Sequence, residues 1–252
     1  MKASLRTALF LVTLLPFLLP AVASANHHKV DALSSDNLKP HNAVVKSVTY
    51  KGQQGIRAEI SDEAKAKLAE ARLKREAAGN QGGPAAGEAD RISHLIVVDE
   101  DFQNGTIELQ VAGEPAPGSS GGARGFVGVA FRVQPDMKTY DCFYLRPTNG
   151  RAEDQERRNH SAQYISHPEY PWYKLRQETP SKYESHVDLQ PATWTKVKIV
   201  VDGEKARLYV HGNDQPTLMI NDVKSGADGK GAVALWFEGS TVAHYSDLKI
   251  TK

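Results

Sequence analysis

The sequence has little of what several classes of protein require. A single cysteine, Cys142, excludes an intramolecular disulfide framework, a CxxC redox pair and a cysteine-based zinc cluster. Charge of one sign is not in excess, because 31 Lys and Arg stand against 30 Asp and Glu in 252 residues. A net charge of +1 gives no positive field for a phosphate backbone, so we expect no binding to nucleic acid.

Long hydrophobic runs are also missing beyond the amino terminus. There, Lys2 and Arg6 precede an apolar run from Ala8 to Val22, and Ala23-Ser24-Ala25 follows it. The run is shorter than the roughly 20 residues that span a bilayer, and the pattern is that of a signal peptide at residues 1–25, cleaved near Ala25. We expect an exported chain, secreted or periplasmic, that is soluble after cleavage, with no membrane insertion of the mature chain.

What is present favours one all-β domain. Hydrophobic residues make up 40% of the chain, enough for a globular core, and single all-β domains commonly reach roughly 200–250 residues. After an N-terminal tail at residues 26–42, two short strands around a glycine-containing turn are expected within residues 43–60. Ser61 to Ala78 is the only predicted helix, with Ser61 as its N-cap. Its apolar face is thin, so residues 61–90 are predicted to form a surface helical insertion and a flexible connector.

From His94 onward, apolar residues recur at every second position, the period of a strand. Turn signals separate short stretches of this kind, no strand–helix–strand alternation occurs, and Asp202-Gly203 is a strong hairpin signal. The pattern predicts an antiparallel two-sheet sandwich domain over residues 43–252. Its later strands are expected at residues 95–98, 106–111, 126–133, 140–146, 194–201, 206–210, 218–223, 232–238 and 243–250.

The strand pattern breaks between Pro147 and Pro191. This stretch is dense in arginine, aromatic and amide residues and is too long for a bare connection in a compact domain. Long ordered loops of this kind usually carry function, so we interpret it as loops lying over a binding face. Its candidate ligand-binding residues are Asn159, Gln163, Tyr164, Trp172 and Arg176.

Five stretches resemble the strand signatures of concanavalin A-like jelly rolls: Phe102–Glu108, Gly125–Arg132, Phe143–Pro147, Trp194–Val201 and Ala232–Trp236. Within that superfamily the sequence is most similar to the laminin-G-like and 3-keto-disaccharide hydrolase-type domains of exported bacterial proteins, over about residues 43–250 without the insertion. The resemblance implies two sheets of six or seven strands, with ligands on a concave face. It implies no single activity, because this sandwich hosts lectins, glycosidases, lyases and adhesion modules.

Side-chain alternation predicts which residues face a ligand. If the apolar residues of three strands, 126–133, 140–146 and 232–238, pack between the sheets, the residues between them point to the opposite face. That face would carry Arg132, Tyr144, Arg146, Trp236 and Glu238. Aromatic rings stack on the C–H groups of sugars, and arginines and carboxylates hydrogen-bond their hydroxyls, so this mixture suits carbohydrate. The alternative is that Trp236 covers an edge of the sandwich and the arginines make surface ion pairs.

The motif Glu-x-Asp-x-Glu of the retaining β-glucanases of this superfamily is missing. The nearest fragment, Glu88–Ile92, lacks the second glutamate and lies in the connector. His160, Glu178 and Glu184 are the catalytic candidates, because His160 titrates near neutral pH among arginines and the two glutamates flank an aromatic segment. Each has a structural alternative: a loop histidine in one hydrogen bond, and carboxylates that neutralise neighbouring arginines.

The resemblance to 3-keto-disaccharide hydrolases implies elimination or hydrolysis at an oxidised sugar, often with a divalent metal. Jelly rolls of this kind also often hold a structural calcium ion, although no Asp-rich loop in this sequence identifies a site for one. We expect an exported carbohydrate-binding jelly-roll domain whose partner is carbohydrate. A glycoside hydrolase or lyase acting on a glycan or 3-keto-sugar is the first alternative, and a protein-interaction module is the second. The sequence indicates neither a metal ligand set nor an oligomeric state.

Overall fold

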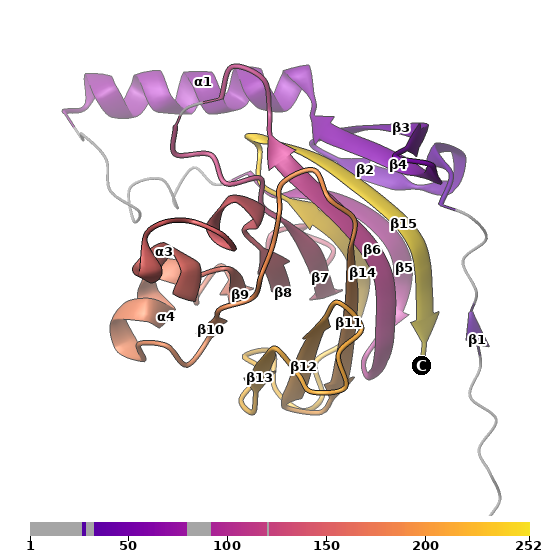
Figure 1. Cartoon of the computed structure of the whole chain (residues 1–252). Coiled ribbons are helices and arrows are strands. Elements are labelled where there is room, and N and C mark those ends of the chain that lie inside the picture. Colours follow the sequence, from indigo (N-terminus) through magenta and orange to yellow (C-terminus); the bar gives the residue numbers. More distant parts are fainter. Residues whose placement is uncertain (1–26, 29–32, 80–91, 120) are drawn as a thin grey trace, which may run out of the picture.

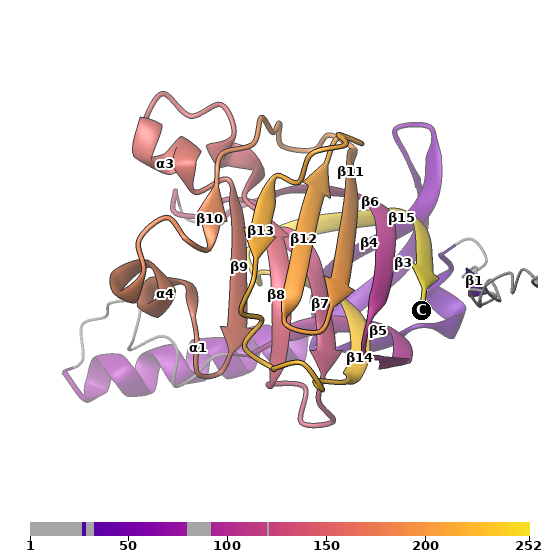
Figure 2. The same ribbon diagram turned by 90° about the horizontal axis from the view of Figure 1, so that it is seen from below.

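The structure is a computed structural model that describes residues 27–28, 33–79, 92–119 and 121–252. The predicted signal peptide and most of the predicted connector lie outside the described residues. The described chain forms two antiparallel sheets packed face to face, which confirms the predicted all-β sandwich (Figure 1, Figure 2).

The first sheet, sheet A, has eight strands. Seven follow the order β13-β12-β11-β6-β15-β4-β3, and β1 pairs with β15. The strands are β1 His27–His28, β3 Ala43–Tyr50, β4 Gln53–Ile60, β6 Gly105–Pro115, β11 Thr195–Asp202, β12 Lys205–Val210, β13 Leu218–Ile220 and β15 Thr241–Thr251. The β3–β4 pair and the β11–β12 hairpin confirm the two predicted turns.

The second sheet, sheet B, has seven strands in the order β10-β9-β8-β7-β14-β5-β2. These are β2 Lys39–His41, β5 His94–Phe102, β7 Val127–Val133, β8 Tyr140–Leu145, β9 Ala162–His167, β10 Glu184–Ser185 and β14 Gly231–Phe237. The predicted pairing of residues 126–133 with 140–146 is confirmed, with Val127 opposite Leu145. Strand β2 falls in the segment predicted as a tail, where it pairs with β5 at the edge of the sheet.

The core lies between the sheets, because both contribute apolar side chains at alternating positions. Sheet A turns the polar residues of its strands to the outside, as the alternating burial of β11 illustrates. Sheet B differs, since every residue of β7, β8 and β9 is buried. Both faces of sheet B are therefore covered, and the segments on its outer face form the surroundings of the site described below.

Helix α1 (Asp62–Ala77) is the predicted surface helix. Ser61 caps it by accepting a hydrogen bond of 3.2 Å from the backbone N–H of Ala64. Ala64 is its one buried residue, and Leu73 is 65% exposed on the outside. The helix runs along the molecule on the side of sheet B away from sheet A (Figure 1, Figure 2). No helix among the described residues is long and apolar enough to cross a membrane.

The prediction of loops between Pro147 and Pro191 is wrong. The segment contains the 3₁₀-helix η2 (Pro147–Asn149), helix α3 (Gln155–Asn159), strand β9, helix α4 (Trp172–Glu178) and strand β10. Strand β9 escapes the sequence pattern because both of its faces are buried, so its polar and apolar residues do not alternate. A further short 3₁₀-helix, η1, spans Ser35–Asn37. Helices α3 and α4 lie beside the β9–β10 edge of sheet B (Figure 2).

Candidate functional site

One row of residues crosses sheet B from β14 to its edge. Trp236 of β14 is opposite Gly128 of β7, and Gly128 is opposite Tyr144 of β8. Tyr144 is opposite Gln163 of β9, which in turn is opposite Glu184 of β10. Directly opposed residues project from the same face of a sheet. Here it is the outer face, because the residues before and after them in β7 and β8 fill the core between the sheets.

Gly128 allows two aromatic rings of this row to meet. A Cβ atom at this position would lie 2.6 Å from the Cβ of Tyr144 and 2.1 Å from the carbonyl oxygen of Phe143, so only glycine fits. The rings of Tyr144 and Trp236, on either side of Gly128, stack with centroids 4.9 Å apart. Phe126 also stacks with Tyr144, at 5.4 Å. Three rings thus form a continuous aromatic stack, in which Phe126 is half-buried and Tyr144 and Trp236 are 2% and 3% exposed.

These rings line a pocket of about 410 Å³, within the ~300–1,000 Å³ range of small-molecule sites. Ile165 of β9 and Trp172, the first residue of α4, add to its apolar wall, and Arg124, Glu238 and Ser240 supply polar groups. Glu238 accepts a hydrogen bond of 2.9 Å at Oε2 from the backbone N–H of Ser240. Within the described chain, the other carboxylate oxygen, Oε1, accepts none. The pocket therefore joins aromatic faces to a carboxylate oxygen that is open to a ligand hydroxyl.

A buried charged cluster adjoins the pocket at Tyr144. Arg146 is 5% exposed and donates hydrogen bonds to the Tyr144 hydroxyl at 2.8 Å and to Gln163 Oε1 at 3.0 Å. It also donates to the carbonyl oxygen of His160 at 2.6 Å. Its guanidinium carbon lies 5.0 Å from the ring centroid of Tyr144 and 5.2 Å from that of Phe126. Hydrogen bonds and cation–π contacts together fix the orientation of this side chain.

Glu184 is the anion of this cluster, and its side chain is 3% exposed. Its Oε1 lies 3.4 Å from Nη1 of Arg146, and its Oε2 accepts a hydrogen bond of 2.9 Å from Nε of Arg176 in α4. Nδ1 of His160 lies 3.0 Å from Oε2, although these two atoms are not aligned for a hydrogen bond. Arg176 also lies 4.7 Å over the ring of Trp172, so the cluster meets the pocket wall a second time.

Burial lowers the pKa of His160 below its ordinary value of 6.5. Glu184 opposes this shift, whereas Arg176 and Arg146 reinforce it. The imidazole is therefore neutral at neutral pH, and one of its ring nitrogens carries a lone pair. A neutral imidazole beside a carboxylate is an arrangement that can accept a proton from a substrate.

Nine of the thirteen residues predicted for the site lie together in the pocket and the adjoining cluster. These are Tyr144, Arg146, His160, Gln163, Trp172, Arg176, Glu184, Trp236 and Glu238. Their common location follows from the alternation of β8 and β14 and from the position of α4. Their contact with a ligand stays a prediction.

The prediction that Arg132 shares this face is wrong. The backbone of Arg132 has a φ of 54°, and the register of β7 with β14 shifts between the pairs Ala130–Ala234 and Val133–Ala232. This β-bulge interrupts the alternation and turns the side chain toward the loops at one end of the sandwich. Arg132 is 1% exposed there and donates hydrogen bonds to Gln103, Asn104, Gly203, Ser225 and Gly226. Its role is to hold these loops together.

Tyr164 also lies away from the pocket. It follows Gln163 in β9, so alternation places it on the opposite face of the strand, in the core. Its hydroxyl donates to the carboxylate of Asp141 at 2.5 Å and accepts a hydrogen bond of 2.9 Å from the backbone N–H of Lys224. The predicted ligand contact of Tyr164 is therefore wrong, because the ring is fully buried on the inner side.

Asn159 and Glu178 lie at the ends of the two short helices and point to solvent. Asn159 is exposed at the end of α3 and accepts a hydrogen bond of 2.8 Å from Gln155 of the same helix. Glu178 is exposed at the end of α4, and it forms no ion pair with any described residue. The structure does not bring either residue into the cluster around Glu184, which corrects their prediction as site residues.

Six residues of the pocket lining are not among those predicted from the sequence: Gly122, Ala123, Arg124, Phe126, Ile165 and Ser240. Alternation contains the signal for Phe126, because an inward Val127 turns the residue before it outward. Arg124 lies in a glycine-rich loop without periodicity, and its Nη1 donates to the carbonyl oxygens of Gly121 and Ala123. Nothing in the sequence around Arg124 predicts its place at the pocket.

The described residues do not fit a metal ion at this site. Within the described ranges, no three His, Cys, Asp or Glu side chains are grouped in a way that could hold one. Glu184, which lies beside His160, is already paired with the guanidinium groups of Arg146 and Arg176. A cation bound to this carboxylate would lie next to two positive charges, which opposes its binding.

Comparison with known proteins agrees with this architecture. Residues 54–251 match the model of a family described as the 3-keto-alpha-glucoside-1,2-lyase-like domain. No curated protein matches the sequence.

Three solved structures are similar to this chain at low sequence identity. A carbohydrate-binding module, CBM66, from Bacillus subtilis is 11% identical, with a TM-score of 0.50 over 84% of this chain and 94% of that one. A putative glycosyl hydrolase from Parabacteroides distasonis is 10% identical, with a TM-score of 0.43 over 86% and 89%. A galectin-like protein of unknown function from Bacillus subtilis is 10% identical, with a TM-score of 0.42 over 89% and 97%. The first likeness confirms the jelly-roll fold and, at this identity, nothing beyond it.

Proposed function

The chain belongs to the family of 3-keto-alpha-glucoside-1,2-lyase-like domains, and on that premise we propose that it binds an α-glucoside, or its 3-keto form, on the outer face of sheet B. The proposed site is the pocket between Phe126, Tyr144, Trp172 and Trp236. It is the face on which the sequence predicts a glycan.

The observation that carries the proposal is the aromatic surface next to hydrogen-bonding groups of fixed orientation. Phe126 and Trp172 present half-buried rings above the stacked pair of Tyr144 and Trp236, and sugar rings bind such surfaces through their C–H groups. Glu238 Oε1 is open to accept from a hydroxyl, and Arg124 can donate to one. Carbohydrate recognition requires this combination of apolar faces and polar groups, whereas a purely apolar ligand would leave Oε1 of Glu238 without a partner.

Isothermal titration calorimetry of methyl α-glucoside and its 3-keto derivative tests the proposal. Trp172→Ala removes a half-buried ring from the pocket wall, and we expect affinity to fall at least about tenfold. Gln177→Ala, at an exposed position on the same helix and outside the pocket lining, is the control and should bind as the unmodified protein does. Equal affinity in all three proteins would refute the site. Failure to bind any glycan, together with capture of an envelope protein that requires Trp172, would favour the protein-interaction alternative.

The pair of His160 and Glu184 favours a second candidate, an elimination at a 3-keto-glucoside. In such a substrate the ketone at carbon 3 acidifies the hydrogen on carbon 2. His160, which is not part of the pocket lining, would accept that proton from a ligand that extends from the pocket to the adjoining cluster. The electron pair would form a double bond between carbons 1 and 2, and the bond from carbon 1 to the glycosidic oxygen would break. The leaving oxygen would take a proton from water. The lowered pKa of His160 supports this role, because a base must be neutral before it accepts a proton.

Turnover of a 3-keto-glucoside separates the two candidates. If the protein is a lyase, His160→Ala abolishes release of the leaving alcohol and leaves binding of the unoxidised glucoside within about twofold. Binding without any release of alcohol by the unmodified protein would reject the lyase and leave the binding function standing.

Export is the remaining part of the proposal. The signal pattern of residues 1–25 supports cleavage after Ala25, so the mature chain should begin at Asn26. Amino-terminal sequencing of the protein recovered from a bacterial periplasm or culture medium tests this. An intact Met1 on protein from the cytoplasm, with none outside it, would contradict export.

A further inference from the structure

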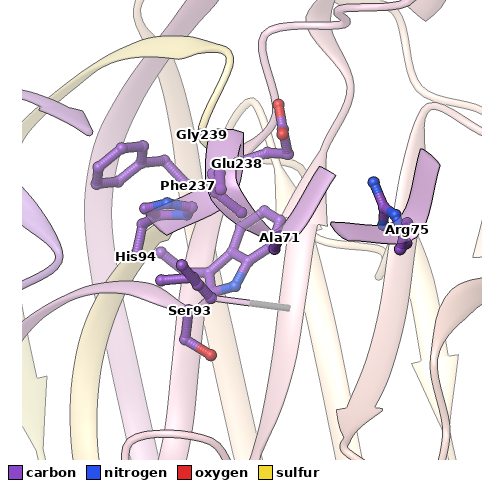
Figure 3. A pocket seen from close by; sticks show the side chains of 10 residues that line it. Ala71, Arg75, Ser93, His94, Phe237, Glu238 and Gly239 are labelled. Carbon is purple, nitrogen blue, oxygen red and sulfur yellow. The ribbon is translucent and has the colours of Figure 1, made fainter. Parts of the chain in front are cut away.

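A second, smaller pocket lies under helix α1. It has a volume of about 200 Å³ and is lined from α1 by Leu68, Ala71 and Arg75. The opposite side is built by residues 92–94 and by residues 236–239, at the start of β5 and the end of β14. Figure 3 shows Ala71 and Arg75 on one side of this space and His94, Phe237 and Gly239 on the other.

This pocket and the aromatic pocket share two residues, Trp236 and Glu238. Trp236 is held between them: its indole N–H donates a hydrogen bond of 3.1 Å to the Tyr140 hydroxyl, and its ring stacks on Tyr144. Glu238 is fixed through Oε2 by Ser240, which leaves Oε1 at the junction. The two spaces are therefore neighbours across one tryptophan and one carboxylate.

The smaller pocket is too small to be a typical ligand site by itself. A volume of about 200 Å³ is below the ~300–1,000 Å³ of typical ligand sites, whereas the aromatic pocket lies within that range. The space persists because α1 approaches the sheet with small side chains: Ala64 and Ala71 point inward, and its one large inward apolar residue is Leu68. A core helix would fill such a gap with larger residues. Helix α1 therefore lines this pocket and does not fill it.

We propose that helix α1 builds a second subsite, in which the next unit of a chain-like glycoside lies when the first unit occupies the aromatic pocket. This inference rests on the proposed function. It assigns to the helical insertion a role in selecting ligand length, with Ala71 and Leu68 as the wall of the subsite and Glu238 as the group that hydrogen-bonds at the junction. The mixed lining, with Ser93 and Arg75 beside apolar groups, suits the hydroxyls and C–H faces of a further sugar ring.

Substitution on α1 tests this inference without touching the aromatic pocket. Ala71→Trp places a large ring in the smaller pocket, and Ala69→Trp places the same ring on the exposed side of the same helix as the control. Titration calorimetry uses methyl α-glucoside and α-linked gluco-oligosaccharides of two to six units, each also in 3-keto form. Thermal melts confirm that both variants remain folded.

The expected result is a gain in affinity of at least tenfold from one unit to two in the unmodified protein and in Ala69→Trp. In Ala71→Trp the gain should disappear, while affinity for methyl α-glucoside stays within about twofold. Binding of methyl α-glucoside with no gain for longer ligands, or a gain that survives Ala71→Trp, overturns the subsite and leaves the proposed function intact. Absence of binding to every glucoside removes the proposed function and the subsite with it.

Discussion

The guanidinium of Arg146 donates a hydrogen bond of 2.8 Å to the hydroxyl of Tyr144, and this contact joins the buried charged cluster to the aromatic pocket. Tyr144 contacts both the pocket and the cluster, because its ring stacks with Trp236 and its hydroxyl accepts a hydrogen bond from Arg146. The orientation of a pocket ring therefore depends on charges that do not themselves line the pocket. Glu184 balances that charge from the edge strand β10.

We expect Tyr144→Phe to weaken glucoside binding about three- to tenfold. The ring remains, but its position is no longer fixed, and a buried donor of Arg146 loses its acceptor, which costs about 1–3 kcal/mol of unfolding free energy. Urea denaturation and calorimetry measure the two effects. Tyr173→Phe is the control, and both variants behaving alike would show that the Arg146–Tyr144 contact has no role in the site.

We expect Glu184→Gln to destabilise the fold by about 3–5 kcal/mol, because it leaves the guanidinium groups of Arg146 and Arg176 without their common anion. Glu178→Gln, at an exposed position, should change the free energy of unfolding by less than about 0.5 kcal/mol. Denaturant unfolding of both proteins measures the difference. A stable Glu184→Gln protein with full affinity would contradict the anchoring role of Glu184.

For Arg132 we expect substitution to lower the stability of the fold strongly and to leave ligand binding unchanged. Arg132→Met removes five hydrogen bonds from a buried guanidinium, and we expect a loss of at least about 3 kcal/mol of unfolding free energy. Below the melting temperature, affinity for methyl α-glucoside should stay within about twofold. Arg72→Met, on the surface of α1, should alter neither quantity. Weaker binding by folded Arg132→Met would restore Arg132 to the ligand site.

Acid should destabilise the protein through His244 in sheet A. His244 is 3% exposed and stacks on Tyr50 at 3.7 Å, and burial, followed by the charge of Arg57, lowers its pKa to about 4. Between pH 6.5 and pH 4 the unfolded chain binds a proton here that the folded chain does not. Stability is therefore present above pH 6.5 and is lost as the pH falls toward 4, by on the order of 3 kcal/mol.

The variant His244→Phe isolates this contribution. It should flatten the dependence of unfolding free energy on pH between 4 and 6.5, as measured by urea denaturation at several pH values. His186→Phe, at an exposed position, should leave the slope unchanged. The same slope in His244→Phe and in the unmodified protein would assign the acid sensitivity to other groups.

Period-two alternation is sufficient to predict most of the fold and much of the site. Tyr144 and Trp236 lie in regular strands, so their outward direction follows from the inward direction of their apolar neighbours. The prediction for Arg132 is wrong because a β-bulge adds a residue to β7, and no turn residue in the sequence indicates this bulge. The prediction for Tyr164 is wrong because β9 is buried on both faces, so its polar and apolar residues do not alternate.

Contacts between segments that are far apart in the chain could not be predicted from the sequence. Glu184 and Arg176 come from β10 and α4, and the contact of Glu184 with Arg146 depends on pairing across three strands. The second pocket depends on where α1 lies against residues 236–239, which the helical pattern of α1 does not encode. Such contacts follow from tertiary packing and not from local propensity.

The most direct test of the account is the crystal structure of the protein soaked with methyl α-glucoside at a saturating concentration. The account predicts a sugar ring in the aromatic pocket against Phe126 and Trp172, with one hydroxyl within about 3 Å of Glu238 Oε1. A sugar bound on the outer face of sheet A, or an aromatic pocket that stays free of sugar under these conditions, would contradict it.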